Sequence, residues 1–351
     1  MRRLPDDTAP IRPDERFDEA RVAAHLRGHL PHLYGDAEIE FAQFPGGKAN
    51  LTYLVRAGDT EMVLRRPPLG PVAPKAHDMA REHRVLSVLH EVYPKAPRAF
   101  LICEDPAVMD KPFFVMERRV GHVIRGVWPR ELTAVGVGPR LVGENLVDAL
   151  AELHGVDPVA IGLGDLGRPE GFVERQVSGW TQRWHHARHE DLPAMDEVAT
   201  RLASTIPAPQ SVALLHNDFK LDNTMIDDDG RIVAVLDWDM ATIGDPLVDL
   251  GTMLAYWGAP GPAAAVAADS VMVGEAIPIA EVAAQYAAAT GFDVSGADWY
   301  RALGLFRVAV IVQQIYIRYL RGQTADERFA VLGDLVEPLA EAALGALELD
   351  A

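Results

Sequence analysis

The chain has 351 residues, 49% of them hydrophobic and 24% charged, and a formal net charge of −18, which is the composition of a globular protein long enough for two lobes. Its negative field disfavours nucleic acid and anionic membranes as partners. The single cysteine, Cys103, excludes an intrachain disulfide, and no apolar run follows the N-terminal arginines, so no secretory signal is expected and the cytoplasm is the expected location.

The first third of the chain predicts an antiparallel sheet. Residues 1–13 are rich in proline and charge and are expected to be loose, and residues 14–30 have the apolar spacing of a helix. Short apolar segments between turn residues predict strands at 39–44, 51–55, 62–64, 99–103 and 113–117. A further helical pattern at 77–92 lies between the third and fourth strands. We therefore expect a sheet of about five strands that carries one helix.

After Gly121 the pattern becomes helical. Amphipathic segments lie at 141–154 and 194–206, and an alanine-rich helical region runs from 251 to the end, with breaks near 258–262 and 291–296. An apolar stretch at 302–317 is interrupted by Arg307, Gln313 and Gln314, so it is interpreted as a buried helix and not as a membrane span. The predicted fold class is α+β, with a sheet lobe at 1–118 and a helical lobe at 119–351.

A glycine-rich turn, Pro45-Gly46-Gly47-Lys48-Ala49-Asn50, joins the first two predicted strands. Glycines allow backbone N–H groups to approach phosphates closely, and Lys48 would add a positive charge there. The same Gly-Gly pair is also common in plain hairpin turns. The residues alone leave both interpretations open.

A second candidate pair consists of Arg65, at the end of the third predicted strand, and Glu82, on the helix that follows. In kinase-like folds a basic side chain on a strand, paired with an acid on a helix, presents a cation to nucleotide phosphates. The alternative is that Arg65 and Arg66 are solvated charges at a strand end and that Glu82 is a solvated helix charge.

The sharpest signal is the segment His216-Asn217-Asp218-Phe219-Lys220-Leu221-Asp222-Asn223, which has the spacing H-x-D-x-x-x-x-N of a phosphoryl-transfer loop. Asp218 would accept the proton of an attacking hydroxyl, Asn223 would hold a metal, and Lys220 would neutralise charge on the transferred group. His216 is expected to fix the loop, and Asp222 to serve as a turn or support residue.

More carboxylates follow the apolar run 232–236. Asp237 is expected at a strand end as a ligand of nucleotide-bound Mg²⁺, and Asp239 is a candidate second ligand. Asp245 and Pro246 have the pattern of a helix start. Asp249, one turn further on, would either face the substrate or, as we expect, anchor the catalytic loop. Whether Asp239, Asp245 or Asp249 contacts a ligand stays open.

Together and in this order, the motifs resemble the aminoglycoside phosphotransferase family, and most of all its branch that is fused to acyl-CoA dehydrogenases in animals. The resemblance extends from Phe44 to Trp257 and includes the glycine-rich turn, Val63-Leu64-Arg65, the catalytic loop and the run from Asp237 to Leu250. It implies a bilobal protein-kinase-like fold that uses ATP with Mg²⁺ to phosphorylate a hydroxyl of a small molecule. The nucleotide-binding residues it implies are Gly46, Gly47, Lys48, Asn50, Arg65, Glu82, Met116 and Glu117.

Three residues depart from the family's pattern. Asn217 replaces the glycine of H-G-D, Arg65 stands where most kinases have lysine, and Lys220 stands where this branch often has arginine. Asparagine tolerates left-handed backbone angles, so the first change is expected to be harmless. Arginine binds phosphate through a planar fork, so Arg65 is expected to make a different phosphate contact. Neither the base nor a metal ligand is lost, and activity is therefore expected.

The acceptor is open between an aminoglycoside, a hydroxyacyl-CoA and another hydroxylated metabolite, as are the oligomeric state and the choice between ATP and GTP. The aromatic residues Trp180, Trp184, Tyr256 and Trp257 would line the acceptor site or, as is more common for such side chains, pack in the core. Two other functions are kept as alternatives, a catalytically silent nucleotide-binding module of the pseudokinase type and a metal-dependent hydrolase that uses the same carboxylates.

Overall fold

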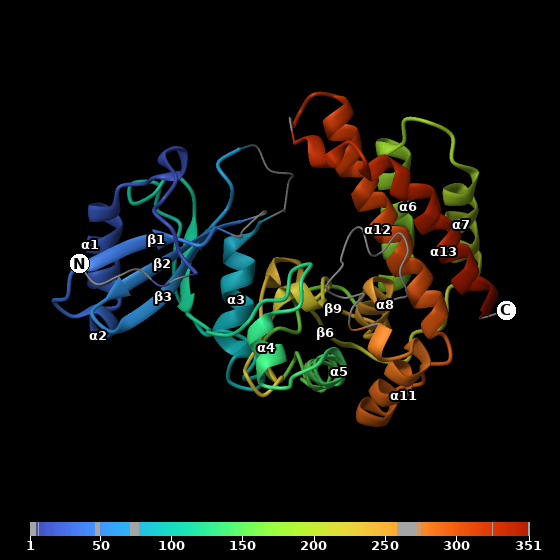
Figure 1. Ribbon diagram of the computed structural model, residues 1–351, viewed down its shortest axis with the longest axis horizontal. Coiled ribbons are helices and arrows are strands. Elements are labelled where there is room, and N and C mark those ends of the chain that lie inside the picture. The colour runs from blue at the N-terminus through green and yellow to red at the C-terminus, as the bar shows by residue number, and fades with distance from the viewer. Residues whose placement is uncertain are drawn as a thin grey trace. The chain divides into compact units, whose positions relative to one another are not determined.

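The computed structural model describes residues 5, 7–45, 50–70, 77–257, 273, 275–324 and 326–349 (Figure 1). The chain divides into two compact units, unit 1 with Met1–Val120 and Ala234–Met240, and unit 2 with Gly121–Val233 and Ala241–Ala351. Unit 1 contains an antiparallel five-stranded sheet and unit 2 is mainly helical, so the predicted α+β class is confirmed. The short segment 234–240, which carries Asp237, packs with unit 1 although it is distant in sequence.

The sheet of unit 1 has the strand order β1-β2-β3-β5-β4, with antiparallel neighbours throughout. Its strands are β1 (Ile39–Gln43), β2 (Leu51–Ala57), β3 (Thr60–Arg66), β4 (Ala99–Cys103) and β5 (Phe113–Glu117). The last two have the predicted bounds, and the first three differ from the prediction by one or two residues at their ends. Apolar runs between turn residues were therefore a sound guide to this sheet.

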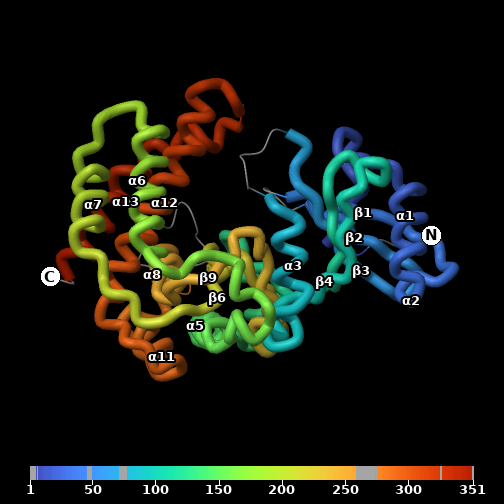
Figure 2. The backbone as a smooth tube through the Cα atoms, turned by 180° about the vertical axis from the view of Figure 1, so that it is seen from behind, coloured from blue at the N-terminus to red at the C-terminus, as the bar shows by residue number. Residues whose placement is uncertain are grey.

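Helices lie on both faces of the sheet, α1 on one and α3 on the other (Figures 1 and 2). The helical segments of unit 1 are η1 (Pro13–Glu15), α1 (Glu19–His29), α2 (Pro31–Tyr34), α3 (Met79–Leu89) and η3 (Trp238–Met240). The helix expected at 14–30 begins only after Asp18, because the Asp18 side chain caps it by accepting from the Arg21 N–H. Asp78 caps α3 in the same way.

Successive side chains of β3 point to opposite faces of the sheet. Leu64 packs in the hydrophobic cluster on the α1 face. On that same face the Arg66 guanidinium is buried, where it donates to the Tyr53 hydroxyl (2.9 Å) and the Glu15 carbonyl (2.6 Å) and lies over the Phe17 ring. Arg65, one residue earlier, must point to the α3 face. The alternation along β3 thus places Arg66 in the packed α1 face and Arg65 on the opposite face, beside α3.

Unit 2 is built from helices around two short strand pairs, β6 with β9 and β7 with β8. Its helices are α4 (Arg130–Ala134), α5 (Pro139–His154), α6 (Phe172–Ala187), α7 (Pro193–Ser204), η2 (Leu221–Asn223), α8 (Leu247–Tyr256), α11 (Ile279–Thr290), α12 (Ala297–Leu320), η4 (Glu327–Phe329), η5 (Leu332–Leu335) and α13 (Val336–Leu349). The predicted helices at 141–154 and 194–206 and the break near 291–296 are confirmed. The break expected near 258–262 lies outside the described residues.

The short strands bring the polar motifs of unit 2 together. β6 (Ala213–Leu215) pairs with β9 (Thr242–Gly244), and the catalytic loop begins directly after β6. Because α8 begins three residues after β9, its first turn lies beside the start of that loop. β7 (Thr224–Ile226) continues from the loop and pairs with β8 (Ile232–Val235), and the segment assigned to unit 1 begins at Ala234, within β8.

Helices α8 and α12 lie against each other at two glycines. A Cβ atom added at Gly304 would lie 2.4 Å from the Gly251 carbonyl oxygen, and one added at Gly251 would lie 2.2 Å from the Tyr300 carbonyl oxygen. By length and composition α12 could span a membrane, with a mean hydropathy of 1.3, yet 61% of its apolar window is buried inside the protein. This burial is what the sequence predicted for 302–317.

Replacing Gly304 with alanine is expected to destabilise unit 2 by about 1–3 kcal/mol, because the new methyl group would overlap backbone atoms that cannot move aside. Gly345→Ala on α13 is the matched control, since a Cβ there meets nothing within 4 Å, and relief of glycine's backbone entropy should stabilise that variant by about 0.5–1 kcal/mol. Urea unfolding followed by far-UV circular dichroism measures both. Equal stability of the two variants would contradict the close helix approach.

Candidate active site

In unit 1, the predicted pair of Arg65 and Glu82 is present. The Arg65 Nε atom lies 3.1 Å from Glu82 Oε2, and the Arg65 guanidinium also forms an ion pair and hydrogen bond with Asp237. Side-chain exposure is 9% for Arg65 and 1% for Glu82. The alternative that Arg65, Arg66 and Glu82 are solvated charges is therefore wrong, because all three are buried.

Asn50 and His77 complete what we call the Arg65 cluster, which consists of Asn50, Arg65, His77, Glu82 and Asp237. With its amide oriented to satisfy its neighbours, Asn50 accepts from Arg65 Nη2 (2.6 Å) and donates to His77 Nδ1 (2.8 Å). The glycine-rich turn that precedes Asn50, with Gly46, Gly47 and Lys48, lies outside the described residues.

The electrostatics of this cluster keep Arg65 positively charged. Burial by itself lowers the pKa of Arg65, but the adjacent Glu82 and Asp237 carboxylates outweigh it and raise that pKa above its ordinary value. Burial raises the pKa of Glu82, and the Arg65 guanidinium opposes that shift. Burial lowers the pKa of His77, against the pull of Asp237. Arg65 therefore stays protonated, and charged N–H donors of this kind form strong hydrogen bonds to anionic groups.

Met116 and Glu117 lie at the end of β5. Met116 is buried and pairs across the sheet with Val63. The Glu117 N–H donates to the Arg98 carbonyl (2.8 Å), and its carboxylate forms an ion pair with Arg119 (3.0 Å). Both contacts fix the strand end, and a nucleotide contact by either residue stays a prediction.

In unit 2, the three predicted residues of the catalytic loop lie together. Asn223 Nδ2 donates to both the carbonyl oxygen and the Oδ2 atom of Asp218, each at 2.9 Å. Lys220 Nζ lies 3.4 Å from the same Oδ2 atom, 3.7 Å from Asp222 and over the Tyr256 ring. Burial lowers the pKa of Lys220, but Asp218, Tyr256 and Asp222 together outweigh this effect and the pKa is raised, so Lys220 is a cation.

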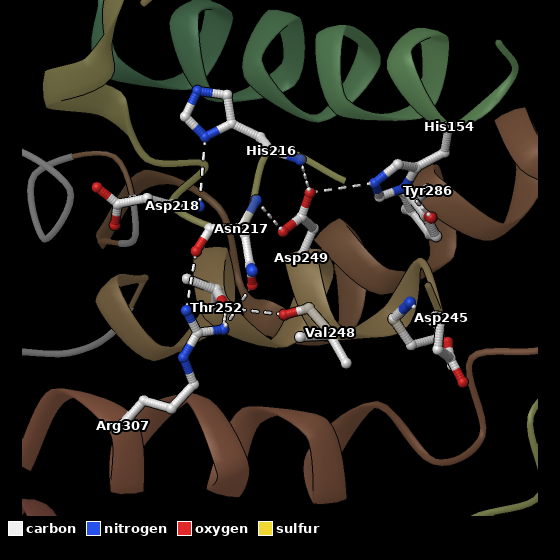
Figure 3. A network of polar contacts seen from close by, with 11 residues as sticks. His154, His216, Asn217, Asp218, Asp245, Val248, Asp249, Thr252, Tyr286 and Arg307 are labelled. Atoms are coloured by element: carbon white, nitrogen blue, oxygen red, sulfur yellow. Dashed lines mark hydrogen bonds and ion pairs between the residues drawn. The ribbon is translucent and has the colours of Figure 1, made fainter. Parts of the chain in front are cut away.

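Asp249 anchors the start of this loop, as expected (Figure 3). Its carboxylate is fully buried and accepts from the backbone N–H groups of His216 (2.7 Å) and Asn217 (2.8 Å). His154 Nε2 lies 3.4 Å from the same carboxylate, and His154 Nδ1 is 2.6 Å from the Tyr286 hydroxyl. These contacts fix the loop on α8 and α5.

His216 and Asp245 have the supporting roles that were expected of them. His216 Nδ1 accepts from the Asp218 N–H at 3.3 Å, which fixes the loop from within. Asp245 accepts from the Leu247 N–H (3.0 Å), and its other oxygen accepts from the Tyr300 hydroxyl (2.7 Å). The N-cap of α8 is Pro246, one residue later than predicted, and Asp245 supports the helix start from the preceding position, where α12 holds it in place.

Unusual backbone angles occur at the same positions. Outside glycine, the described residues with positive φ are His77 (57°), Asn217 (68°) and Asp237 (71°). Such angles cost free energy and persist only where surrounding contacts enforce them, and they concentrate at functional sites. Here they belong to the Arg65 cluster and to the residue before Asp218.

The sequence patterns did not single out Arg307, which contacts the loop from α12 through the Asn217 carbonyl (2.8 Å). A signal existed, because an arginine within an apolar helical run needs a partner. The aromatic residues Trp180, Trp184, Tyr256 and Trp257 are all buried in unit 2, as expected of core side chains.

Comparison with known proteins places these motifs in a family. The model of the phosphotransferase enzyme family that includes the aminoglycoside phosphotransferases matches residues 40–303. The rat protein named acyl-CoA dehydrogenase family member 11 is 34% identical over 351 residues, and the match covers 96% of this chain but only 44% of that protein. This chain thus spans less than half the length of that relative.

Solved structures agree with this assignment. A crystal structure of a candidate aminoglycoside phosphotransferase from Ralstonia eutropha is 30% identical, with a TM-score of 0.79, and the match covers 95% of this chain and 99% of the other. The aminoglycoside phosphotransferase APH(4)-Ia, solved with AMP-PNP and hygromycin B, is 16% identical with a TM-score of 0.59 (91% and 99% covered), which shows a shared fold. The chain therefore belongs to the phosphotransferase enzyme family of the aminoglycoside phosphotransferases.

Proposed function

We propose that this protein transfers the γ-phosphate of ATP to a hydroxyl group of a small molecule. The observation that carries the proposal is the constellation of Asp218, Lys220 and Asn223 on a loop fixed by the buried Asp249 carboxylate. Phosphoryl transfer needs a positioned nucleophile and neutralisation of charge more than covalent catalysis. Membership of a phosphotransferase family supports the same reaction class.

Asp218 is the proposed general base. Its Oδ2 atom accepts from Asn223 and lies near Lys220, whereas Oδ1 has no hydrogen-bond partner among the described residues. That oxygen can accept the proton of an incoming hydroxyl as its oxygen attacks phosphorus. Lys220 is held close enough to offset negative charge on the transferred group.

The donor atoms fit Mg²⁺ with a nucleotide better than a metal held by protein alone. No group of three or more histidine, cysteine, aspartate or glutamate side chains suited to a metal occurs in the described part of the chain. Mg²⁺ commonly takes one or two protein oxygens and completes its shell with phosphates and water. The amide nitrogen of Asn223 donates to Asp218, and these hydrogen bonds do not involve the amide oxygen, which is the atom that could bind Mg²⁺. Asn223 is the proposed ligand of the ion on the catalytic loop, and the ion would supply neutralisation at the phosphates. The metal role of Asp237, which lies in unit 1, stays a prediction from the sequence.

Arg65 is the proposed phosphate contact of unit 1. Glu82 holds its Nε side, and the planar fork of arginine suits phosphate oxygens.

For the acceptor, we propose a hydroxylated small molecule and place hydroxyacyl-CoA esters first for testing, because the rat relative is named an acyl-CoA dehydrogenase family member. Aminoglycosides are the competing class, after the family's name.

The purified protein is expected to release ADP from ATP and Mg²⁺ only when a suitable hydroxylated acceptor is present. The panel should pair each hydroxyacyl-CoA with the acyl-CoA that lacks the hydroxyl, alongside aminoglycosides. Asn223→Ala should abolish turnover and change the melting temperature without ATP only a little. Tight ATP binding without transfer to any acceptor would favour the silent nucleotide-binding module. Metal-dependent phosphate release without nucleotide affinity would favour the hydrolase.

A further inference from the structure

The two peptide groups that flank Asn217 are both held by buried charges from different helices (Figure 3). On one side, the Asn217 N–H donates to Asp249 Oδ1 at 2.8 Å. On the other side, its carbonyl accepts from Arg307 Nη2 at 2.8 Å. Together the two contacts set both backbone angles of a residue whose φ is 68°, in the left-handed region that a side chain normally disfavours.

Arg307 is built into this position by the packing of α12. Gly304, one turn earlier, allows α12 to approach α8 closely, which brings the guanidinium beside Thr252. Arg307 Nη1 donates to Thr252 Oγ1 at 2.9 Å, and that hydroxyl in turn donates to the Val248 carbonyl at 2.8 Å. The Arg307 side chain is buried, so its contacts are made away from solvent.

The Asn217 side chain adds a contact that a glycine could not make. Its Oδ1 atom lies 3.4 Å from Arg307 Nη1, so the arginine fork faces both the carbonyl and the amide of one residue. Burial lowers the pKa of Arg307, and the Asp218 and Asp249 carboxylates oppose that shift. The two carboxylates therefore help to keep the buried guanidinium charged.

We propose that Arg307 is the positioning residue of the proposed base, and that Asn217, in place of the family's glycine, is its dedicated partner. The carbonyl that Arg307 holds belongs to the peptide bond that leads into Asp218, so this contact sets the direction in which the Asp218 carboxylate points. The inference rests on the proposed function, because it gives Arg307 a purpose only if Asp218 acts on a hydroxyl.

Hydrogen exchange measures the anchoring without any need for activity. In Arg307→Met, peptides that cover residues 214–223 are expected to exchange about tenfold to a hundredfold faster, as loss of a charge-assisted hydrogen bond implies. Peptides from the sheet of unit 1 should not change. Arg307→Lys keeps the positive charge and N–H donors but loses the planar fork, so its exchange rate should fall between those of the wild type and Arg307→Met. Arg301→Met is the matched control, because Arg301 is on the same helix but pairs with Asp298.

Kinetics then separate positioning from general support of the fold. Arg307→Met is expected to lower kcat about tenfold to a hundredfold, as a small misplacement of a catalytic group does, with the KM for ATP almost unchanged. Asn217→Gly should lower kcat by a smaller factor in the Arg307→Met background than in the wild type, because the partner of the Asn217 amide is already missing. Arg307→Lys should recover part of kcat.

Unchanged loop exchange and unchanged kcat in Arg307→Met would overturn the proposal, and so would a fall in kcat that only follows the folded fraction. If Arg307→Met does not fold, the same two measurements are made on Arg307→Lys and Asn217→Gly. Loop exchange and kcat equal to those of the wild type in both variants would overturn the proposal. A wild-type protein that turns over no acceptor would instead refute the proposed function, and the exchange experiment would still report whether Arg307 holds the loop.

Discussion

Asp218→Asn is expected to lower kcat about a hundredfold to ten-thousandfold, the range found when a general base is removed. The substitution keeps the shape of the side chain, and its amide oxygen can still accept from Asn223 Nδ2, which lies 2.9 Å from Asp218 Oδ2. What is lost is the oxygen that takes the proton and the charge that faces Lys220. Steady-state ADP release with saturating ATP and acceptor measures the effect.

Asp222→Asn is the matched control for this prediction. Asp222 also lies near Lys220, at 3.7 Å, so its substitution removes a carboxylate from the same cation without touching the hydrogen bond from Asn223. The control is expected to keep most of its turnover. Equal losses in the two variants would show that the charge around Lys220 matters more than the identity of the base. Full activity of Asp218→Asn would place the base elsewhere.

The sheet and the catalytic loop could be predicted because their signals are local. Strands β4 and β5 follow from short apolar runs between turn residues, and their predicted bounds match those of the structure. The spacing from Asp218 to Asn223 is also local, since a single 3₁₀ turn brings the two side chains into hydrogen-bond contact. The Arg65 and Glu82 pair needed a rule about kinase-like folds in addition to the pattern.

Contacts between distant segments could not be predicted in the same way. Arg307 forms a hydrogen bond with Asn217, which is 90 residues away in the sequence. The position of Arg307 in an apolar run indicates that it needs a polar partner, but it does not indicate which residue that partner is. The approach of α12 to α8 depends on Gly304 and Gly251 facing each other, and no periodicity within one helix contains that fact. The burial of Arg66 is similar, because its partners on η1 and β2 are far from it in sequence.

Arg65→Met is expected to destabilise unit 1 by about 3–5 kcal/mol, because it leaves the buried Glu82 carboxylate without its counter-charge. The two side chains form an ion pair at 3.1 Å, and Glu82 Oε1 also accepts from the Trp238 N–H at 3.3 Å. Hydrogen exchange of the strand peptides 51–66 and 113–117 measures this loss. Peptides 141–154 of unit 2 serve as the internal control.

A second substitution separates the structural role of Arg65 from its proposed role at the phosphates. Adding Glu82→Gln removes the uncompensated charge and keeps an oxygen for the Trp238 N–H, so most of the lost stability should return. ATP affinity should stay about tenfold to a hundredfold below that of the wild type, because the charged donors of Arg65 are still missing. Recovery of both stability and affinity in the double variant would refute the phosphate role of Arg65. Wild-type stability of Arg65→Met alone would refute the buried charge pair.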